Sequence, residues 1–136
     1  MKLKKARNSR RRLSFYRAAY GFKPPFSVLV DGTAVVTSLN LKVSLEDELP
    51  KLLGGKVRLL VPKAVVSELR AFGPRFQEAE RLARTFRPLE EDAASTQTAA
   101  ETLLGKVGDG NPDRLMVLTE DGGLQRELAR VPGVPL

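Results

Sequence analysis

Short continuous runs of apolar residues alternate along the chain with segments in which apolar residues recur every three or four positions. Such runs, rich in valine and leucine, are typical of strands that are buried on both faces of a sheet. The predicted strands are 26–30, 57–61 and 115–119. A further apolar run at 131–136 predicts the start of a fourth strand where the sequence ends, so we expect the domain to be truncated at its C-terminal end.

Helical periodicity fills the intervals between these runs. The predicted helices are 34–39, 44–53, 62–72, 74–86, 99–107 and 121–130. The apolar positions of the third of these helices are Val65, Val66, Leu69 and Phe72, and the segment 87–98 is expected to be an acidic loop. Strands that alternate with helices predict an α/β fold, with a parallel β-sheet flanked by helices.

Positive charge is concentrated in the N-terminal segment. The chain has 136 residues and a formal net charge of +7, yet residues 1–23 hold nine basic side chains and no acidic one. From residue 24 onward, acidic residues slightly outnumber basic ones. We therefore expect a basic N-terminal arm at 1–24, joined to a globular domain at 25–136.

A segment of this kind suits a polyanion, because each lysine or arginine that contacts a phosphate releases counterions. The candidate RNA-binding residues are Lys2, Lys4, Lys5, Arg7, Arg10, Arg11, Arg12, Arg17 and Lys23. The apolar residues of the arm recur at about helical spacing, which predicts a basic helix. A solvated tail or localisation signal is the alternative interpretation, and binding to an anionic membrane surface is disfavoured because the arm lacks a wide apolar face.

Cysteine and histidine are both absent. Their absence excludes disulfides, thiol nucleophiles, Ser-His-Asp triads and zinc sites made of cysteine or histidine. No stretch approaches the roughly 20 apolar residues of a transmembrane helix, so no membrane span is expected. Any catalysis would therefore depend on carboxylates, hydroxyls or amines together with a hard metal ion.

Acidic residues follow the predicted strands at the end where parallel α/β sheets bind ligands. Asp31 and Asp121 come after the first and third predicted strands, and Glu68 and Glu101 lie on helices near the same edge. Four such carboxylates could share magnesium or manganese and hydrolyse a phosphodiester. Each also has a structural interpretation, since Asp31 and Asp121 are good helix caps and the two glutamates are ordinary solvated helix residues.

The sequence resembles a known family over essentially its whole length. The segments that carry the resemblance are Val-Leu-Val-Asp-Gly-Thr, Leu-Pro-Lys-Leu-Leu-Gly-Gly, Val-Val-Ser-Glu-Leu-Arg-Ala-Phe-Gly, Gly-Asn-Pro, Thr-Glu-Asp, Val-Pro-Gly-Val-Pro-Leu and the N-terminal Tyr-Gly-Phe-Lys-Pro-Pro-Phe. They are similar to the PIN-domain ribosome-biogenesis factors of the Fcf-one/Utp-twenty-three family.

The resemblance implies a PIN-like domain at 25–136 with an acidic site at Asp31, Glu68, Glu101 and Asp121. It implies a protein of the nucleus and nucleolus that acts in early small-subunit rRNA maturation. The implied partners are the pre-rRNA of the small subunit, an H/ACA snoRNA and other proteins of the small-subunit processome.

The sequence departs from the family pattern in three ways. The Cys-Cys-His-Cys zinc site of the family would fall in 85–102, where Phe86 and Thr102 stand at two of the ligand positions, so no zinc is expected. The third acidic position is Glu101 preceded by Ala100, where the nucleolytic branch has an adjacent aspartate pair. Family members also continue beyond the position at which this sequence ends.

Three functions are consistent with these features. The first, which the reduced acidic set favours, is a non-catalytic ribosome-biogenesis factor that binds pre-rRNA or snoRNA. The second is a magnesium- or manganese-dependent endoribonuclease that cleaves pre-rRNA with the four carboxylates. The third is a basic-tailed interaction module without an RNA role.

Overall fold

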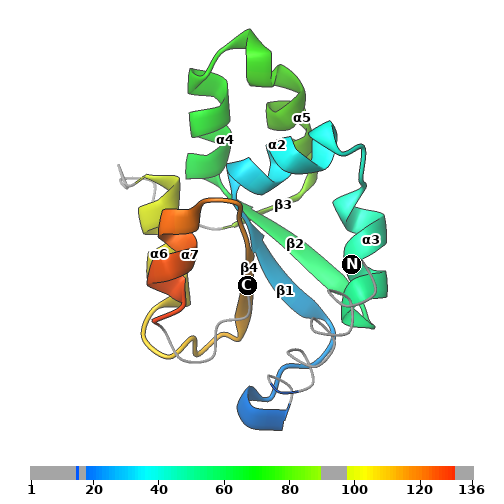
Figure 1. Ribbon diagram of the computed structural model, residues 1–136, viewed down its shortest axis with the longest axis vertical. Coiled ribbons are helices and arrows are strands. Elements are labelled where there is room, and N and C mark those ends of the chain that lie inside the picture. The colour runs from blue at the N-terminus through cyan, green and yellow to red at the C-terminus, as the bar shows by residue number, and fades with distance from the viewer. Residues whose placement is uncertain (1–14, 16–17, 90–97, 131–136) are drawn as a thin grey trace.

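The computed structural model of the chain describes Phe15 and residues 18–89 and 98–130. Its strands are β1 (Phe26–Val30), β2 (Val57–Pro62), β3 (Arg87–Leu89) and β4 (Leu115–Leu118). The α-helices, which flank the sheet in Figure 1, are α2 (Gly32–Asn40), α3 (Leu45–Leu53), α4 (Lys63–Ala71), α5 (Gln77–Thr85), α6 (Ala99–Val107) and α7 (Gly122–Leu128). A short 3₁₀ helix, η1 (Pro74–Phe76), joins α4 to α5.

The four strands form one parallel sheet in the order β3-β2-β1-β4. The prediction of an α/β fold with a parallel sheet is therefore confirmed in the described part of the chain. β1 lies in the interior of the sheet, where Val28 pairs with Leu59 on one side and with Met116 on the other. Strands with neighbours on both sides and helices on both faces require apolar side chains throughout, which explains the continuous apolar runs.

Each face of the sheet has its own core cluster. One face packs against α2–α5 and contains Phe26, Val28, Val30 and Met116. The other face contains Leu29, Leu115 and Val117, which pack with residues of α6 and α7. Alternate residues of β1 thus belong to different clusters, because successive side chains of a strand point to opposite faces.

Helix boundaries follow local signals in the sequence. Gly54 ends α3 in the left-handed conformation, with φ of 73°, a common helix terminus. Pro62, predicted in the first turn of a helix, is instead the last residue of β2 and the N-cap of α4. Within α4, Val65 and Leu69 are buried as the periodicity predicts.

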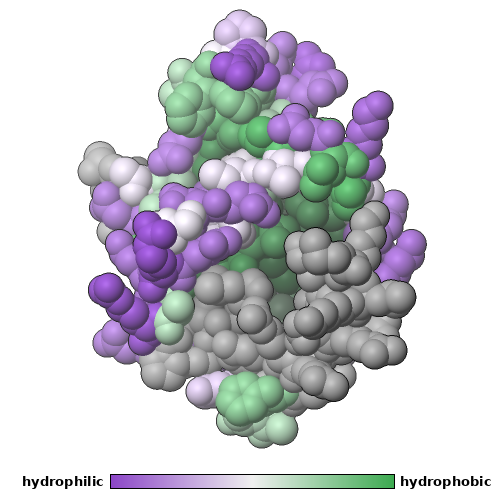
Figure 2. Space-filling view, in the orientation of Figure 1, coloured by the Kyte–Doolittle hydropathy of each residue, from purple (hydrophilic) through white to green (hydrophobic). Residues whose placement is uncertain are grey.

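Two predictions about the segments that follow β2 were wrong. The segment 87–89 was expected to be loop, but it forms β3, in which Arg87 pairs with Leu60 of β2. Phe72, counted among the apolar positions of the third predicted helix, is 67% exposed. Phe72 is the C-cap of α4, which ends at Ala71, and its ring packs edge-to-face on Phe76. Figure 2 shows the resulting apolar patch over the α4–η1 turn.

The N-terminal segment joins the core before β1 begins. Phe22 is 4% exposed and belongs to the same core cluster as Phe26. The Nε of Arg114 donates a hydrogen bond to the carbonyl oxygen of Tyr20, at 2.9 Å. The predicted helix of the arm and the predicted strand at 131–136 lie outside the described residues, except for helical turns at Phe15 and 18–20.

A close backbone approach connects this segment to the turn before β2. A Cβ built on Gly55 would lie 2.6 Å from Cγ of Pro24, nearer than any ordinary carbon contact. Gly55 is therefore needed for space, whereas Gly105 of α6 has no atom within 4 Å of such a Cβ.

We expect Gly55→Ala to lower the free energy of unfolding by about 1–3 kcal/mol, because Pro24 must shift to admit the methyl group. Gly105→Ala, the matched control, should raise the free energy of unfolding by about 0.5–1 kcal/mol, since alanine is the better helix former. Urea unfolding followed by circular dichroism measures both. A Gly55→Ala protein as stable as the wild type would contradict the close approach.

Candidate functional site

The carboxyl ends of β1 and β4 meet at Asp31. Its backbone N–H donates to the carbonyl oxygen of Leu118 at 3.0 Å, which extends the pairing of the two strands by one step. The residue is only 7% exposed. Asp31 also caps α2, with its Oδ1 accepting from the N–H of Gly32 at 2.8 Å.

The second carboxylate oxygen of Asp31 accepts two hydroxyl hydrogen bonds. Thr119 donates to Oδ2 at 2.7 Å and Thr33 donates to the same oxygen at 2.9 Å. The two hydroxyl oxygens lie 3.2 Å apart. Both oxygens of Asp31 are thus engaged, as a buried carboxylate requires.

Sequence reasoning missed these two threonines as site residues. The hydroxyl of Thr33 accepts from the N–H of Glu120 at 2.9 Å, and that of Thr119 accepts from the N–H of Asp121 at 3.0 Å. They link Asp31 to the turn that follows β4. The available signal was their position, two residues after Asp31 and two before Asp121, where hydroxyls commonly bond to nearby backbone.

Asp121 is the N-cap of α7. Its Oδ1 accepts from the N–H groups of Gly123 at 2.9 Å and Leu124 at 3.3 Å. Gln125, on the first turns of the same helix, donates to the carbonyl oxygen of Thr119 at 2.7 Å. The cap therefore fixes α7 against the end of β4.

Glu68 and Glu101 both act at the N-terminal turn of α6. Glu68 of α4 is exposed, and its Oε1 accepts from the N–H of Ala99 at 2.8 Å. Thr98 and Glu101 form a variant of the capping box. The Thr98 hydroxyl accepts from the Glu101 N–H at 3.2 Å, and Glu101 Oε1 accepts from the Thr98 hydroxyl, rather than from its backbone N–H, at 3.1 Å. Glu68 thus pairs a backbone N–H that the first turn of α6 leaves without a helical partner, and Glu101 holds the hydroxyl of the N-cap residue.

The four predicted carboxylates thus form two pairs, each with a structural task. Within residues 15, 18–89 and 98–130, no group of three or more acidic side chains is arranged to hold a metal ion. Catalytic and metal-binding roles for Asp31, Glu68, Glu101 and Asp121 stay predictions.

The positions expected to match a zinc site are part of the core. Phe86 and Thr102 are each 5% exposed, and the Thr102 hydroxyl donates to the carbonyl oxygen of Thr98 at 2.9 Å. The intervening segment 90–97 lies outside the described residues.

Of the candidate RNA-binding residues, only Lys23 is described, and it is exposed. Lys2, Lys4, Lys5, Arg7, Arg10, Arg11, Arg12 and Arg17 lie outside the described residues. None of the described helices is long and apolar enough to cross a bilayer.

The sequence is similar to those of known proteins. The sequence model of the Fcf1 family matches residues 51–136. The chain is 25% identical to rRNA-processing protein utp23 of Schizosaccharomyces pombe over 140 residues, which is 100% of this chain and 54% of that protein. It is 29% identical to rRNA-processing protein FCF1 of Saccharomyces cerevisiae over 123 residues, or 90% of this chain and 64% of the relative. The chain therefore spans about half the length of utp23 and less than two thirds of the length of FCF1.

A solved structure shares the fold. A chain described as the PIN domain endonuclease Utp24 superposes with a TM-score of 0.72, at 24% identity, covering 82% of this chain and 84% of that one. This similarity confirms the predicted PIN-like fold.

We expect Asp31→Asn to lower the free energy of unfolding by about 1–3 kcal/mol, because an amide NH₂ would face either the Gly32 N–H or the two hydroxyl donors. Asp113→Asn, at an exposed position, is the matched control and should change it by less than about 0.5 kcal/mol. Urea unfolding measures the free energy of unfolding of both variants. Equal values for Asp31→Asn and Asp113→Asn would show that the hydrogen bonds of Asp31 do not stabilise the fold.

Proposed function

Because this chain belongs to the Fcf1 family, we propose that it is an RNA-binding factor of rRNA processing and ribosome biogenesis. In this proposal the PIN-like domain is a scaffold and the basic arm holds phosphates. The relatives' names support the process, since both are called rRNA-processing proteins.

The observation that supports a non-catalytic role is the engagement of the four carboxylates. Asp31 uses both oxygens for hydrogen bonds, while Glu68, Glu101 and Asp121 each act at a helix N-terminus. A carboxylate that caps a helix contributes to stability without any reaction, so its presence needs no catalytic explanation.

The proposed RNA partners are the pre-rRNA of the small subunit and an H/ACA snoRNA. The proposed protein partners are other components of the small-subunit processome, and the proposed location is the nucleus and nucleolus. The arm supports an RNA partner through its nine bases without an acid. Attraction of this kind is sequence-independent, so recognition of one RNA would depend on contacts beyond phosphate.

The second candidate is a divalent-metal endoribonuclease, with magnesium or manganese at the acidic site. Two observations favour it: the structurally similar chain is described as an endonuclease, and Asp31 and Asp121 are linked through Thr119 at one end of the sheet. A bound metal would supply charge stabilisation and an activated water.

The arm is best tested by substitution in the full chain, because deletion of residues 1–23 would also remove the buried Phe22. Replacing the seven bases of residues 2–12 by glutamine should weaken binding of single-stranded RNA. The slope of log K against log salt should also become shallower. Its magnitude should fall by up to about 5 if all seven bases contact phosphate. Glu101→Gln, which preserves a capping box, should leave affinity unchanged. Fluorescence anisotropy across a salt series measures both, and an unchanged slope would contradict the role of the arm.

The two candidate functions differ in what happens to the RNA. With manganese or magnesium, the proposed factor should leave single-stranded RNA of the small-subunit precursor intact on a denaturing gel. Cleavage by the wild type that is lost in Glu101→Gln would establish the endoribonuclease instead, because glutamine retains the cap but removes the charge. Matching unfolding curves for the two proteins are the control for folding.

A further inference from the structure

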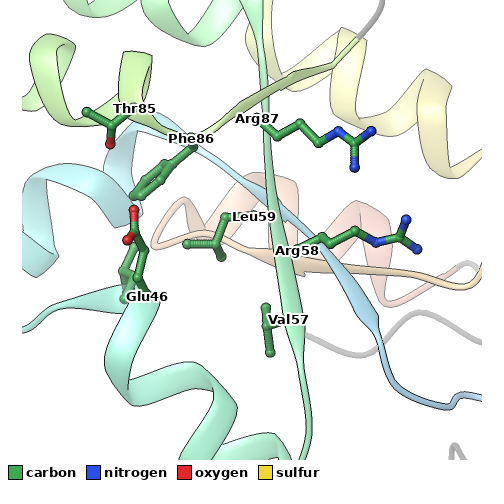
Figure 3. Close-up of a pocket in the computed structure, with 8 residues that line it drawn as sticks. Glu46, Val57, Arg58, Leu59, Thr85, Phe86 and Arg87 are labelled. Carbon is green, nitrogen blue, oxygen red and sulfur yellow. The ribbon is translucent and has the colours of Figure 1, made fainter.

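Two arginines lie side by side on one face of the sheet. Arg87 of β3 pairs with Leu60 of β2, and Arg58 lies two residues before Leu60 in the same strand. Paired residues of parallel strands share a face, and so do residues two apart in one strand. Figure 3 shows both guanidinium groups extending to the same side, away from Glu46 and Phe86. Both side chains are exposed.

The arginines are exposed because the helices cover only part of this face. Leu60 and Leu89 pack with the cluster that α6 and α7 bury. β3 is three residues long and begins opposite Leu60, so Arg58 has no strand partner on that side within the described residues. The open corner of the sheet thus lies at the amino ends of the strands.

Other bases surround this corner. Lys51, Lys56 and Arg58 line one surface pocket together with Pro25 and Gly55. We call the five exposed bases Lys23, Lys51, Lys56, Arg58 and Arg87 the amino-edge surface.

The N-terminal segment enters β1 directly beside this surface. Pro24 packs against Gly55, and the N–H of Phe26 donates to the carbonyl oxygen of Lys56 at 2.8 Å. Lys23 precedes Pro24, so the bases of the arm are connected in sequence to the bases of the body.

Within the described part of the chain, ion pairs compensate little of the positive charge on the amino-edge surface. Among the described residues, the one ion pair it makes joins Lys51 to Glu48 at 3.6 Å, between exposed side chains, where such pairs are weak. Lys23, Lys56, Arg58 and Arg87 have no ion pair within the described part of the chain. The acids at the carboxyl ends of β1 and β4 lie at the other end of the strands.

We infer that the amino-edge surface is a second phosphate-binding surface, over which single-stranded RNA continues from the basic arm. Arginine guanidinium binds phosphate through paired N–H donors, and lysine adds a mobile point charge. This inference rests on the proposed function, and it assigns the RNA to the end of the sheet opposite the carboxylates.

The test compares two full-length variants that lose the same charge. The surface variant is Lys56→Gln, Arg58→Gln and Arg87→Gln; the control is Lys42→Gln, Lys63→Gln and Arg81→Gln, three exposed bases without an ion pair in the described residues. The probe is a single-stranded RNA 20-mer of mixed sequence, titrated by fluorescence anisotropy across a salt series. Thermal unfolding confirms that both variants are folded.

We expect the surface variant to lose about 2 from the salt slope and to bind about 40-fold more weakly at 0.15 M salt, as removal of three single-strand phosphate contacts implies. The control should remain within about twofold of the wild type. A surface variant that behaves as the control would overturn the inference while the proposed function stands. Wild-type protein that binds no RNA would overturn the proposed function itself. A poly-glutamate peptide is the second probe: if the surface variant loses that ligand but not RNA, the surface serves an acidic protein partner and the inference is wrong.

Discussion

A carboxylate buried between two strand ends must have hydrogen-bond partners on both oxygens, and the centre of this fold depends on that condition being met at Asp31. Its backbone continues the pairing of β1 with β4, its Oδ1 starts α2, and its Oδ2 holds the hydroxyls of Thr33 and Thr119. One side chain thereby joins two strands, a helix and the turn that leads to Asp121. The residues around Asp31, which include two of the four predicted site carboxylates, therefore also join several elements of the fold.

Opposite ends of the same sheet differ in charge. The carboxyl ends of β1 and β4 carry acids that are tied to backbone N–H groups, whereas the amino end of β2 carries exposed bases with little compensation. The near-neutral body that the composition suggested is therefore an average over two distinct surfaces. This difference is the basis on which we place a polyanion at the amino ends of the strands in our inference.

The buried strands were predictable because their signal is local. The apolar runs at 26–30, 57–61 and 115–119 match β1, β2 and β4 to within one residue. β3 was not predictable, since Arg87-Pro88-Leu89 has no apolar run and becomes a strand only by pairing with β2. Phe72 misled because periodicity cannot show that α4 ends one residue earlier.

The same distinction holds at the candidate site. The caps at Asp31 and Asp121 were among the predicted alternatives, because a cap depends on residues one to three positions away. The bond from Ala99 N–H to Glu68 spans 31 residues, so nothing in the sequence pattern could place that glutamate at the end of α6. Sequence position thus predicted the two aspartate caps, whereas tertiary packing decides which of the four acids come together.

Separation along the strands also bears on how binding and any cleavage could be related. β1 has five residues, which at about 3.3 Å per residue span about 17 Å between the amino and carboxyl ends of the sheet. RNA phosphates bound at Lys56 and Arg58, as we infer, would therefore lie at the end of the sheet opposite Asp31. A substitution at one end should leave the function of the other end intact. In the function we propose, RNA binding at the amino-edge surface would therefore not depend on cleavage chemistry at the carboxylates.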